Sequence, residues 1–155
     1  LGQADFKYKG DDAKTEENRR EGYFTVGDIG YLNAEGYLFL CDRKSDMIIS
    51  GGVNIYPAEI EAVMIQYPEI VDVAVFGIPH ADWGEEVKAV VQPVDGKTGD
   101  EKFAQEILSF CADKLAKYKT PRSINFTTEM PRDPNGKLYK RKLRDPYWEG
   151  HEKAI

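Results

Sequence analysis

A chain of 155 residues has room for one ordinary domain, or for a small domain that carries the edge of a larger one. Hydrophobic residues make up 41% of it and charged residues 31%, which is typical of a folded globular protein and excludes the fibrous and intrinsically disordered classes. The net charge of −6 argues against nucleic acid as the main partner, because phosphate binding needs a basic face.

The cysteines and the apolar runs indicate the cellular location of the protein. Cys41 and Cys111 are distant from each other in sequence and from any histidine at metal-binding spacing, which indicates buried thiols in a reducing compartment. No apolar run approaches the length of a membrane span, and the first residues lack the features of a signal peptide. We therefore expect a cytoplasmic protein without a transmembrane segment. The first residue, Leu1, is not methionine, so we also expect a fragment.

The first part of the chain predicts a loop followed by a β-hairpin. Residues 1–22 are rich in charge and poor in apolar anchors, which is typical of a solvated loop with at most one helical turn. From Tyr23 the pattern changes to that of a strand, and it continues to Leu32. The turn residues of Asn33–Gly36 then precede a second strand that ends at Cys41.

Four polar residues at 42–45 interrupt the apolar pattern and predict a domain boundary. Met47–Ile49 has the composition of a short strand. Gly51 and Gly52 predict either a turn or a place where a ligand comes close to the backbone. Pro57 suits the first turn of the helix that the following apolar spacing indicates.

The rest of the chain predicts a small α+β domain. Asp100 is placed to cap a helix with one apolar face, and the basic segment after residue 130 reads as a loop that enters a short C-terminal helix. The expected strands are Ile70–Ile78, Glu86–Val94 and Ser123–Phe126. This order predicts a roughly three-stranded sheet flanked by helices, preceded by a β-hairpin from the edge of a larger missing domain.

Three charged side chains are candidates for nucleotide chemistry. Asp28 follows a glycine beside a strand and offers two acceptor oxygens, which suit vicinal ribose hydroxyls, although an isolated aspartate at such a position more often orders a turn. Arg43 is a forked cationic donor suited to a ribose or phosphate, or an ordinary surface arginine. Lys137, after Gly136, is a flexible point charge that could follow negative charge as it develops on a carboxylate or phosphate.

Two aromatic residues near loops are candidates for base stacking. Trp83 and Tyr118 could each cover an adenine face or fill a gap as half-buried side chains. The cluster Lys140, Arg141, Lys142 and Arg144 has the pattern of a solvated basic face.

Three motifs in order resemble the C-terminal part of the adenylate-forming superfamily, which contains acyl- and aryl-CoA synthetases, adenylation domains of peptide synthetases and luciferases. They are Tyr23–Asp28, Asp42–Glu61, and Pro131 followed by Gly136 and Lys137. The resemblance covers nearly the whole chain from about Gly22 onward. It implies a two-step reaction in which a carboxylic acid and ATP give an acyl-adenylate, and the thiol of CoA then displaces AMP. It also implies a C-terminal domain that swings between two orientations.

The resemblance implies roles for individual residues. Asp28 and Arg43 match the positions that hold the ribose of ATP, and Lys137 matches the adenylation lysine. The pair Gly51 and Gly52 matches the segment that lines the pantetheine tunnel. Two further positions match contacts to the CoA nucleotide, namely Trp83 and Tyr118. Mg²⁺ is expected from the family, with ligands outside this chain.

The predicted hinge departs from the family pattern. Ser45 occupies the position that is usually Asp or Lys, and it lies between Lys44 and Asp46. The family's Thr-Gly-Asp motif has one additional residue here, between Thr25 and the glycine before Asp28. The expected organisation is the edge of the large N-terminal domain over residues 1–41, a hinge over 42–46 and the mobile C-terminal domain over 47–155.

The resulting hypothesis is the C-terminal domain of an ATP-dependent carboxylic acid:CoA ligase, of which fatty acid:CoA ligases are one kind. Its partners would be the acid, ATP, CoA and the missing N-terminal domain of the same polypeptide, and the fragment alone is expected to be inactive. Two alternatives stay open. One is an adenylation domain that passes the acyl group to a carrier protein, and the other is a binding module without catalysis.

Overall fold

The computed structural model describes residues 7–151. The chain divides into two compact units, Leu1–Ser45 and Asp46–Ile155. The division falls inside the segment that the sequence predicts as a hinge, residues 42–46. Whether this segment acts as a hinge stays a prediction.

The first unit contains one short helix and two antiparallel strand pairs. Helix α1 spans Asp12–Glu17, and strands β1 (Arg19–Arg20) and β2 (Tyr23–Phe24) form the first pair. Strands β3 (Asp28–Leu32) and β4 (Leu38–Arg43) form the predicted hairpin. Strand β4 runs two residues beyond the expected end, because its last residues still pair with the start of β3. A single 3₁₀ turn, η1, then spans Lys44–Asp46.

The hairpin of β3 and β4 is rich in exposed apolar side chains. Tyr31 and Phe39 stack with ring centroids 5.2 Å apart, yet both rings remain exposed. Leu32, Leu38 and Leu40 are exposed to between 64% and 68%. An isolated two-stranded hairpin is at best marginally stable in water. We therefore expect these exposed apolar side chains to pack against another part of the protein.

The second unit is built on a five-stranded sheet with the order β6-β5-β8-β7, in which β9 also pairs with β8. Strands β7 and β8 form a long antiparallel hairpin, and β9 runs parallel to β8. The strands span Ile48–Ser50 (β5), Val53–Ile55 (β6), Ile70–His80 (β7), Gly84–Pro93 (β8) and Ser123–Phe126 (β9). The α+β class is confirmed.

The sheet has more strands than the three or so that the sequence predicts, because the glycine pair closes an extra hairpin. Gly51 and Gly52 have φ angles of +57° and +80°, and an added Cβ at either position would meet nothing within 4 Å. Two successive residues at positive φ connect β5 to β6 in the manner of a tight hairpin turn. Of the two sequence alternatives, the turn is therefore observed.

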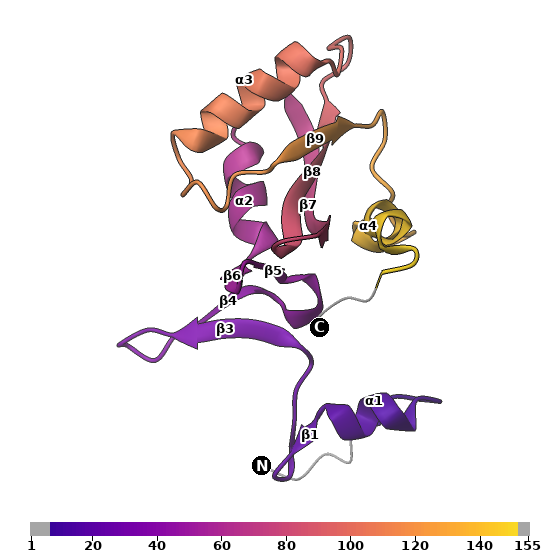
Figure 1. The fold of residues 1–155 in the computed structure, drawn as a ribbon. Helices are drawn as coiled ribbons and strands as arrows, with labels where there is room; N and C mark the ends of the chain where they lie inside the picture. The colour runs from indigo at the N-terminus through magenta and orange to yellow at the C-terminus, as the bar shows by residue number, and fades with distance from the viewer. Residues whose placement is uncertain (1–6, 152–155) are drawn as a thin grey trace. The chain divides into compact units, whose positions relative to one another are not determined.

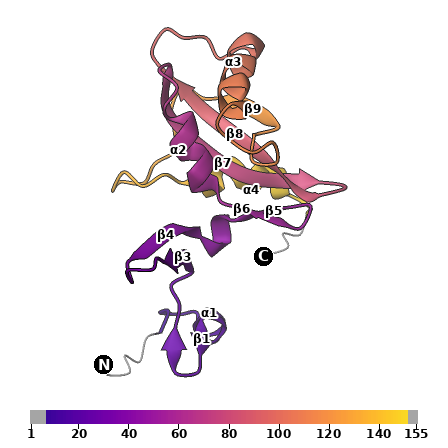
Figure 2. The same cartoon turned by 90° about the vertical axis from the view of Figure 1, so that its left-hand side faces the viewer.

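Helices cover both faces of this sheet (Figure 1 and Figure 2). Helix α2 (Pro57–Met64) and helix α3 (Glu101–Ala112) bury their apolar side chains against one face, together with inward residues of β7 and β8. Helix α4 (Lys140–Trp148) packs Leu143 and Tyr147 against the opposite face. Asp100 accepts a hydrogen bond from the Phe103 amide at 2.8 Å, which confirms the predicted cap of α3.

No helix within residues 7–151 combines the length and the apolar character that crossing a bilayer requires.

The two cysteines differ in accessibility, which gives a test of the packing. Cys111 on α3 is fully buried, and this burial raises the pKa of its thiol to about 11, whereas Cys41 on β4 is partly exposed. At pH 8 only about one thousandth of the Cys111 side chains would be thiolate. We expect Ellman's reagent to modify Cys41 rapidly and Cys111 only on unfolding. A rapid phase that persists in a Cys41→Ser variant would contradict this packing.

Candidate functional site

The first unit brings together the two residues predicted to hold ribose. Asp28 and Arg43 are directly opposite each other in the β3–β4 ladder, and Arg43 Nε lies 3.9 Å from Asp28 Oδ1. Neither side chain is buried, so both retain donor or acceptor capacity for a ligand. The preceding turn is ordered by Thr25, whose hydroxyl accepts a hydrogen bond from the Gly27 amide at 3.1 Å. The structure therefore assigns Thr25 a local structural contact.

The predicted hinge residues form one short turn. Lys44, Ser45 and Asp46 make up η1, and the amide of Lys44 donates to the carbonyl of Gly27 at 2.7 Å. The division between the two units follows Ser45 directly.

Three residues predicted to contact CoA line one pocket of the second unit. Its volume is about 150 Å³, and Gly51, Trp83 and Tyr118 all contribute to its wall. Gly52 is not among the lining residues. The complete lining is Ser50, Gly51, Trp83, Glu86, Val87, Tyr118, Thr120 and Arg122.

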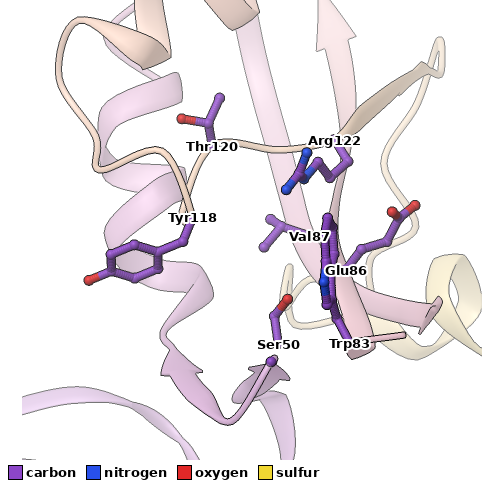
Figure 3. A pocket seen from close by; sticks show the side chains of 8 residues that line it. Ser50, Trp83, Glu86, Val87, Tyr118, Thr120 and Arg122 are labelled. Atoms are coloured by element: carbon purple, nitrogen blue, oxygen red, sulfur yellow. The ribbon is translucent and has the colours of Figure 1, made fainter. Parts of the chain in front are cut away.

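Two turns and one connecting segment form this pocket. The Gly51 amide donates to the Trp83 carbonyl at 2.9 Å, and Ser50 pairs with Gly84 across β5 and β8. These contacts hold the β5–β6 turn against the β7–β8 turn. Tyr118 comes from the segment between α3 and β9, and Figure 3 shows it across the pocket from Trp83.

The ring of Trp83 is held by two neighbours. His80 stacks on it with ring centroids 4.4 Å apart, and the guanidinium of Arg122 lies 4.4 Å from the ring. His80 is itself fixed, because its Nδ1 accepts hydrogen bonds from the amides of Asp82 and Trp83. Sequence reasoning missed Arg122, which has no local motif around it. Trp83 therefore forms a rigid wall of the pocket.

Tyr118 is the more open of the two aromatic side chains. It is 51% exposed, and its neighbour Lys119 ties the segment to α2 through Glu59, with Nζ 2.7 Å from each carboxylate oxygen. That hydrogen bond raises the pKa of Lys119. The backbone around Tyr118 is thus anchored while its ring remains accessible to a stacking partner.

Lys137 lies in a separate exposed loop between β9 and α4. Its ammonium makes no hydrogen bond or ion pair with any other residue in the described range 7–151. It is absent from the lining of the pocket around Gly51. The structure thus places three of the four predicted CoA residues around one pocket and the predicted adenylation lysine outside it.

A buried lysine on β8 has a structural role. Lys88 donates to Ser123 Oγ at 3.0 Å and to Asn125 Oδ1 at 3.2 Å, and its Nζ lies 5.1 Å from the ring centroid of Tyr147. Desolvation lowers its pKa. These contacts join β8, β9 and α4, so Lys88 fastens α4 to the sheet.

Within residues 7–151, no group of three or more His, Cys, Asp or Glu side chains could hold a metal ion. The expectation that Mg²⁺ is bound by ligands outside this chain stays a prediction.

The family model for the AMP-binding enzyme C-terminal domain matches residues 59–137. The chain belongs to this family. The match confirms the resemblance to the C-terminal portion of the adenylate-forming superfamily. The matched range includes the pocket residues Trp83 and Tyr118 as well as Lys137.

Curated relatives of this C-terminal domain are CoA ligases. A long-chain-fatty-acid–CoA ligase of Mycobacterium tuberculosis is 45% identical over 126 residues, which are 81% of this chain and 24% of that protein. A 2-succinylbenzoate–CoA ligase of Bacillus mycoides is 46% identical over 130 residues, which are 84% of this chain and 26% of that protein. The chain thus spans about a quarter of the length of these relatives.

A solved structure has the same fold. ATP-bound MatB from Rhodopseudomonas palustris aligns with a TM-score of 0.79 and 38% identity, covering 90% of this chain and 27% of that one.

Proposed function

We propose that the whole protein is an ATP-dependent carboxylic acid:CoA ligase, of which this chain is the C-terminal part. In the first step a carboxylate oxygen attacks the α-phosphorus of ATP, giving an acyl-adenylate and pyrophosphate. In the second step the CoA thiolate attacks the acyl carbon, giving the thioester and AMP. The observation that carries the proposal is the pocket that Gly51, Trp83 and Tyr118 share. The CoA ligases among the relatives support it.

The first step would use the charged residues. Asp28 would accept hydrogen bonds from the ribose hydroxyls, and Arg43, held opposite it in the ladder, would donate to the same nucleotide. Lys137 would supply a mobile positive charge to the carboxylate and phosphate oxygens as charge shifts between them. Mg²⁺ would neutralise phosphate charge in this step, with ligands from the preceding part of the polypeptide.

The second step would use the pocket of the second unit. A CoA nucleotide has an adenine ring for Tyr118 to cover and phosphates for the guanidinium of Arg122 to contact. The pantetheine arm would follow the turn at Gly51 and Gly52, where the absence of side chains leaves the backbone open. A carrier protein presents the pantetheine arm without the adenine, so this pocket favours free CoA over the carrier-protein alternative.

The proposal includes the domain organisation predicted from the sequence. Residues 1–41 would complete the large N-terminal domain of the same polypeptide, which would cover the exposed apolar side chains of the β3–β4 hairpin. Residues 42–46 would serve as the hinge, and residues 47–155 would turn between the two steps. The chain by itself would then lack activity. The free thiols of Cys41 and Cys111 support a cytoplasmic location.

The experiment is a two-stage assay of the full-length protein with ATP, CoA and a panel that includes palmitate and 2-succinylbenzoate. Tyr118→Ala is expected to raise the KM for CoA about tenfold, because a stacked base contributes this much or more, while pyrophosphate release from ATP and the acid is unchanged. Tyr118→Phe keeps the ring and serves as the matched control. The proposal fails if the wild type forms no adenylate or thioester with any acid, or if Tyr118→Ala leaves the KM for CoA unaltered.

A further inference from the structure

Two ion pairs attach the loop that carries Lys137 to one edge of the sheet. We propose that Arg132 and Lys140 are positioning residues, which fix where Lys137 can reach during acyl-adenylate formation. The inference rests on the proposed function, because it assigns Lys137 to that half-reaction. From the sequence alone, these charged side chains have the pattern of an ordinary solvated surface.

The loop is closed by its own hydrogen bonds. Asp133 N donates to the Lys137 carbonyl at 2.9 Å, and Asp133 Oδ1 accepts from the amides of Asn135 and Lys137, each at 2.8 Å. Gly136, at φ +83°, completes the turn, and its amide donates to the Asp133 carbonyl at 2.9 Å. The backbone of Lys137 is therefore fixed relative to Asp133, and the loop can move only as one piece.

The first anchor holds the start of the loop. Arg132 Nη1 donates to the Gly136 carbonyl at 2.6 Å, and Nη2 of the same guanidinium pairs with the Asp72 carboxylate on β7. One planar cation thus connects the residue before Lys137 to the strand. Lysine has a single terminal nitrogen and cannot reproduce this fork with its fixed geometry.

The second anchor holds the chain just after the loop. Lys140 Nζ lies 2.7 Å from Glu61 Oε1, and both side chains are largely covered, at 18% and 21% exposure. The same Glu61 oxygen accepts a hydrogen bond from the Val75 amide on β7 at 2.7 Å. Glu61 thereby links α2, the edge of β7 and the first residue of α4.

The two anchors act at separate points along β7. Asp72 and Val75 are three residues apart, a distance of about 10 Å along a strand. A single attachment would let the loop rock, whereas two attachments leave only the four-carbon stem of Lys137 free. A cation held in this way starts each encounter near its productive position, and misplacement of about 1 Å can cost about a hundredfold in rate.

The solvent exposure of the paired side chains predicts how much each ion pair contributes to stability. Arg132 is 45% exposed, so its ion pair with Asp72 contributes little to global stability. Lys140 and Glu61 are only 18% and 21% exposed, so loss of Lys140 would leave a largely covered carboxylate without its cation. Removing the pair of Arg132 with Asp72 should therefore change the rate of the first half-reaction more than it changes the melting temperature. Lys140→Arg keeps a cation beside Glu61 and controls for any loss of stability in Lys140→Ala.

The test uses the full-length protein and measures each half-reaction by itself. Pyrophosphate release is followed in single turnovers with ATP and whichever of palmitate and 2-succinylbenzoate the wild type activates, and thioester formation is followed from the preformed acyl-adenylate and CoA. The variants are Arg132→Ala and Lys140→Ala, with Lys137→Ala as the reference for loss of the lysine. Arg141→Ala removes an exposed cation from the same segment and is the matched control.

We expect each anchor variant to slow pyrophosphate release about tenfold or more while thioester formation changes less than about twofold. Lys140→Arg keeps the pair with Glu61 and should restore most of the rate. Hydrogen exchange of the amides at 133–138 should quicken in Arg132→Ala, whereas the amides paired between β7 and β8 should keep their protection.

Contrary outcomes distinguish this inference from the proposed function. If Lys137→Ala slows pyrophosphate release and the anchor variants do not, the positioning role is wrong and the proposed function stands. If the anchor variants slow both half-reactions equally and lower the melting temperature, their role is structural and the inference is overturned. If Lys137→Ala itself leaves pyrophosphate release unchanged, the assignment of Lys137 fails and the inference falls with it.

Discussion

Alanine in place of Lys137 is expected to slow acyl-adenylate formation by the full-length protein by about two to three orders of magnitude, the usual cost of removing one group that stabilises developing charge. Nζ of Lys137 has no hydrogen bond or ion pair among residues 7–151, so the substitution removes a cation without disturbing the packing of this part of the chain. Thioester formation from supplied acyl-adenylate should be nearly unchanged. The measurement is single-turnover pyrophosphate release, followed by the reaction of purified acyl-adenylate with CoA.

Lys142→Ala provides the matched control for this experiment. Lys142 is an exposed lysine five residues further along, and its Nζ lies 5.5 Å from the centroid of the Tyr139 ring. We expect it to keep the wild-type rate of both steps. Equal losses in Lys137→Ala and Lys142→Ala would point to a general electrostatic effect and contradict a specific role for Lys137.

Truncation of Phe103 to alanine is expected to lower the free energy of unfolding by about 3–5 kcal/mol, as for other large buried side chains. Phe103 is 1% exposed and stacks on Phe126 with ring centroids 5.4 Å apart, so it joins α3 to β9. Tyr67 lies against the same ring at 5.9 Å. Urea unfolding of the chain, followed by tryptophan fluorescence, measures the loss.

Phe110→Ala on the same helix is the matched comparison. Phe110 is only partly buried and contacts Tyr67 edge-on at 5.3 Å, so the cavity left by its removal is open to water. We expect a loss of about 1–2 kcal/mol, roughly a third of that at Phe103. Comparable losses at the two positions would mean that the apolar face of α3 is not packed as described.

Local patterns were sufficient for most of the individual elements. The cap at Asp100 and the apolar spacing after it predicted α3, and the alternation from Ile70 predicted β7. The strand pairing was not predicted, because the parallel contact of β9 with β8 joins segments separated by a whole helix. The short strand before Gly51 was predicted, but strand β6 after Gly52 was missed, since a three-residue strand has too few residues to show a period.

The candidate site, too, could be predicted from the sequence only in part. Asp28, Arg43 and Lys137 were proposed from residue chemistry and from resemblance, and the structure pairs the first two across one ladder. Arg122 beside Trp83 and the pair of Arg132 with Asp72 had no signal in the sequence. Such contacts join residues about 40 to 60 positions apart. The sequence around a charged residue does not indicate which distant residue it will contact in the folded protein.

The contacts that hold the Lys137 loop also cover part of the edge of the sheet. Among the strands of residues 7–151, β7 pairs with β8 alone, so its other side could accept a strand from a second molecule. On that side the Val75 amide already donates a hydrogen bond to the Glu61 carboxylate, and the Asp72 carboxylate is paired with the charged guanidinium of Arg132. A strand approaching this edge would have to displace both. The contacts that anchor the Lys137 loop therefore also protect this edge of the sheet against pairing with a strand of another molecule, and this protection by Asp72, Arg132, Glu61 and Lys140 does not depend on catalysis.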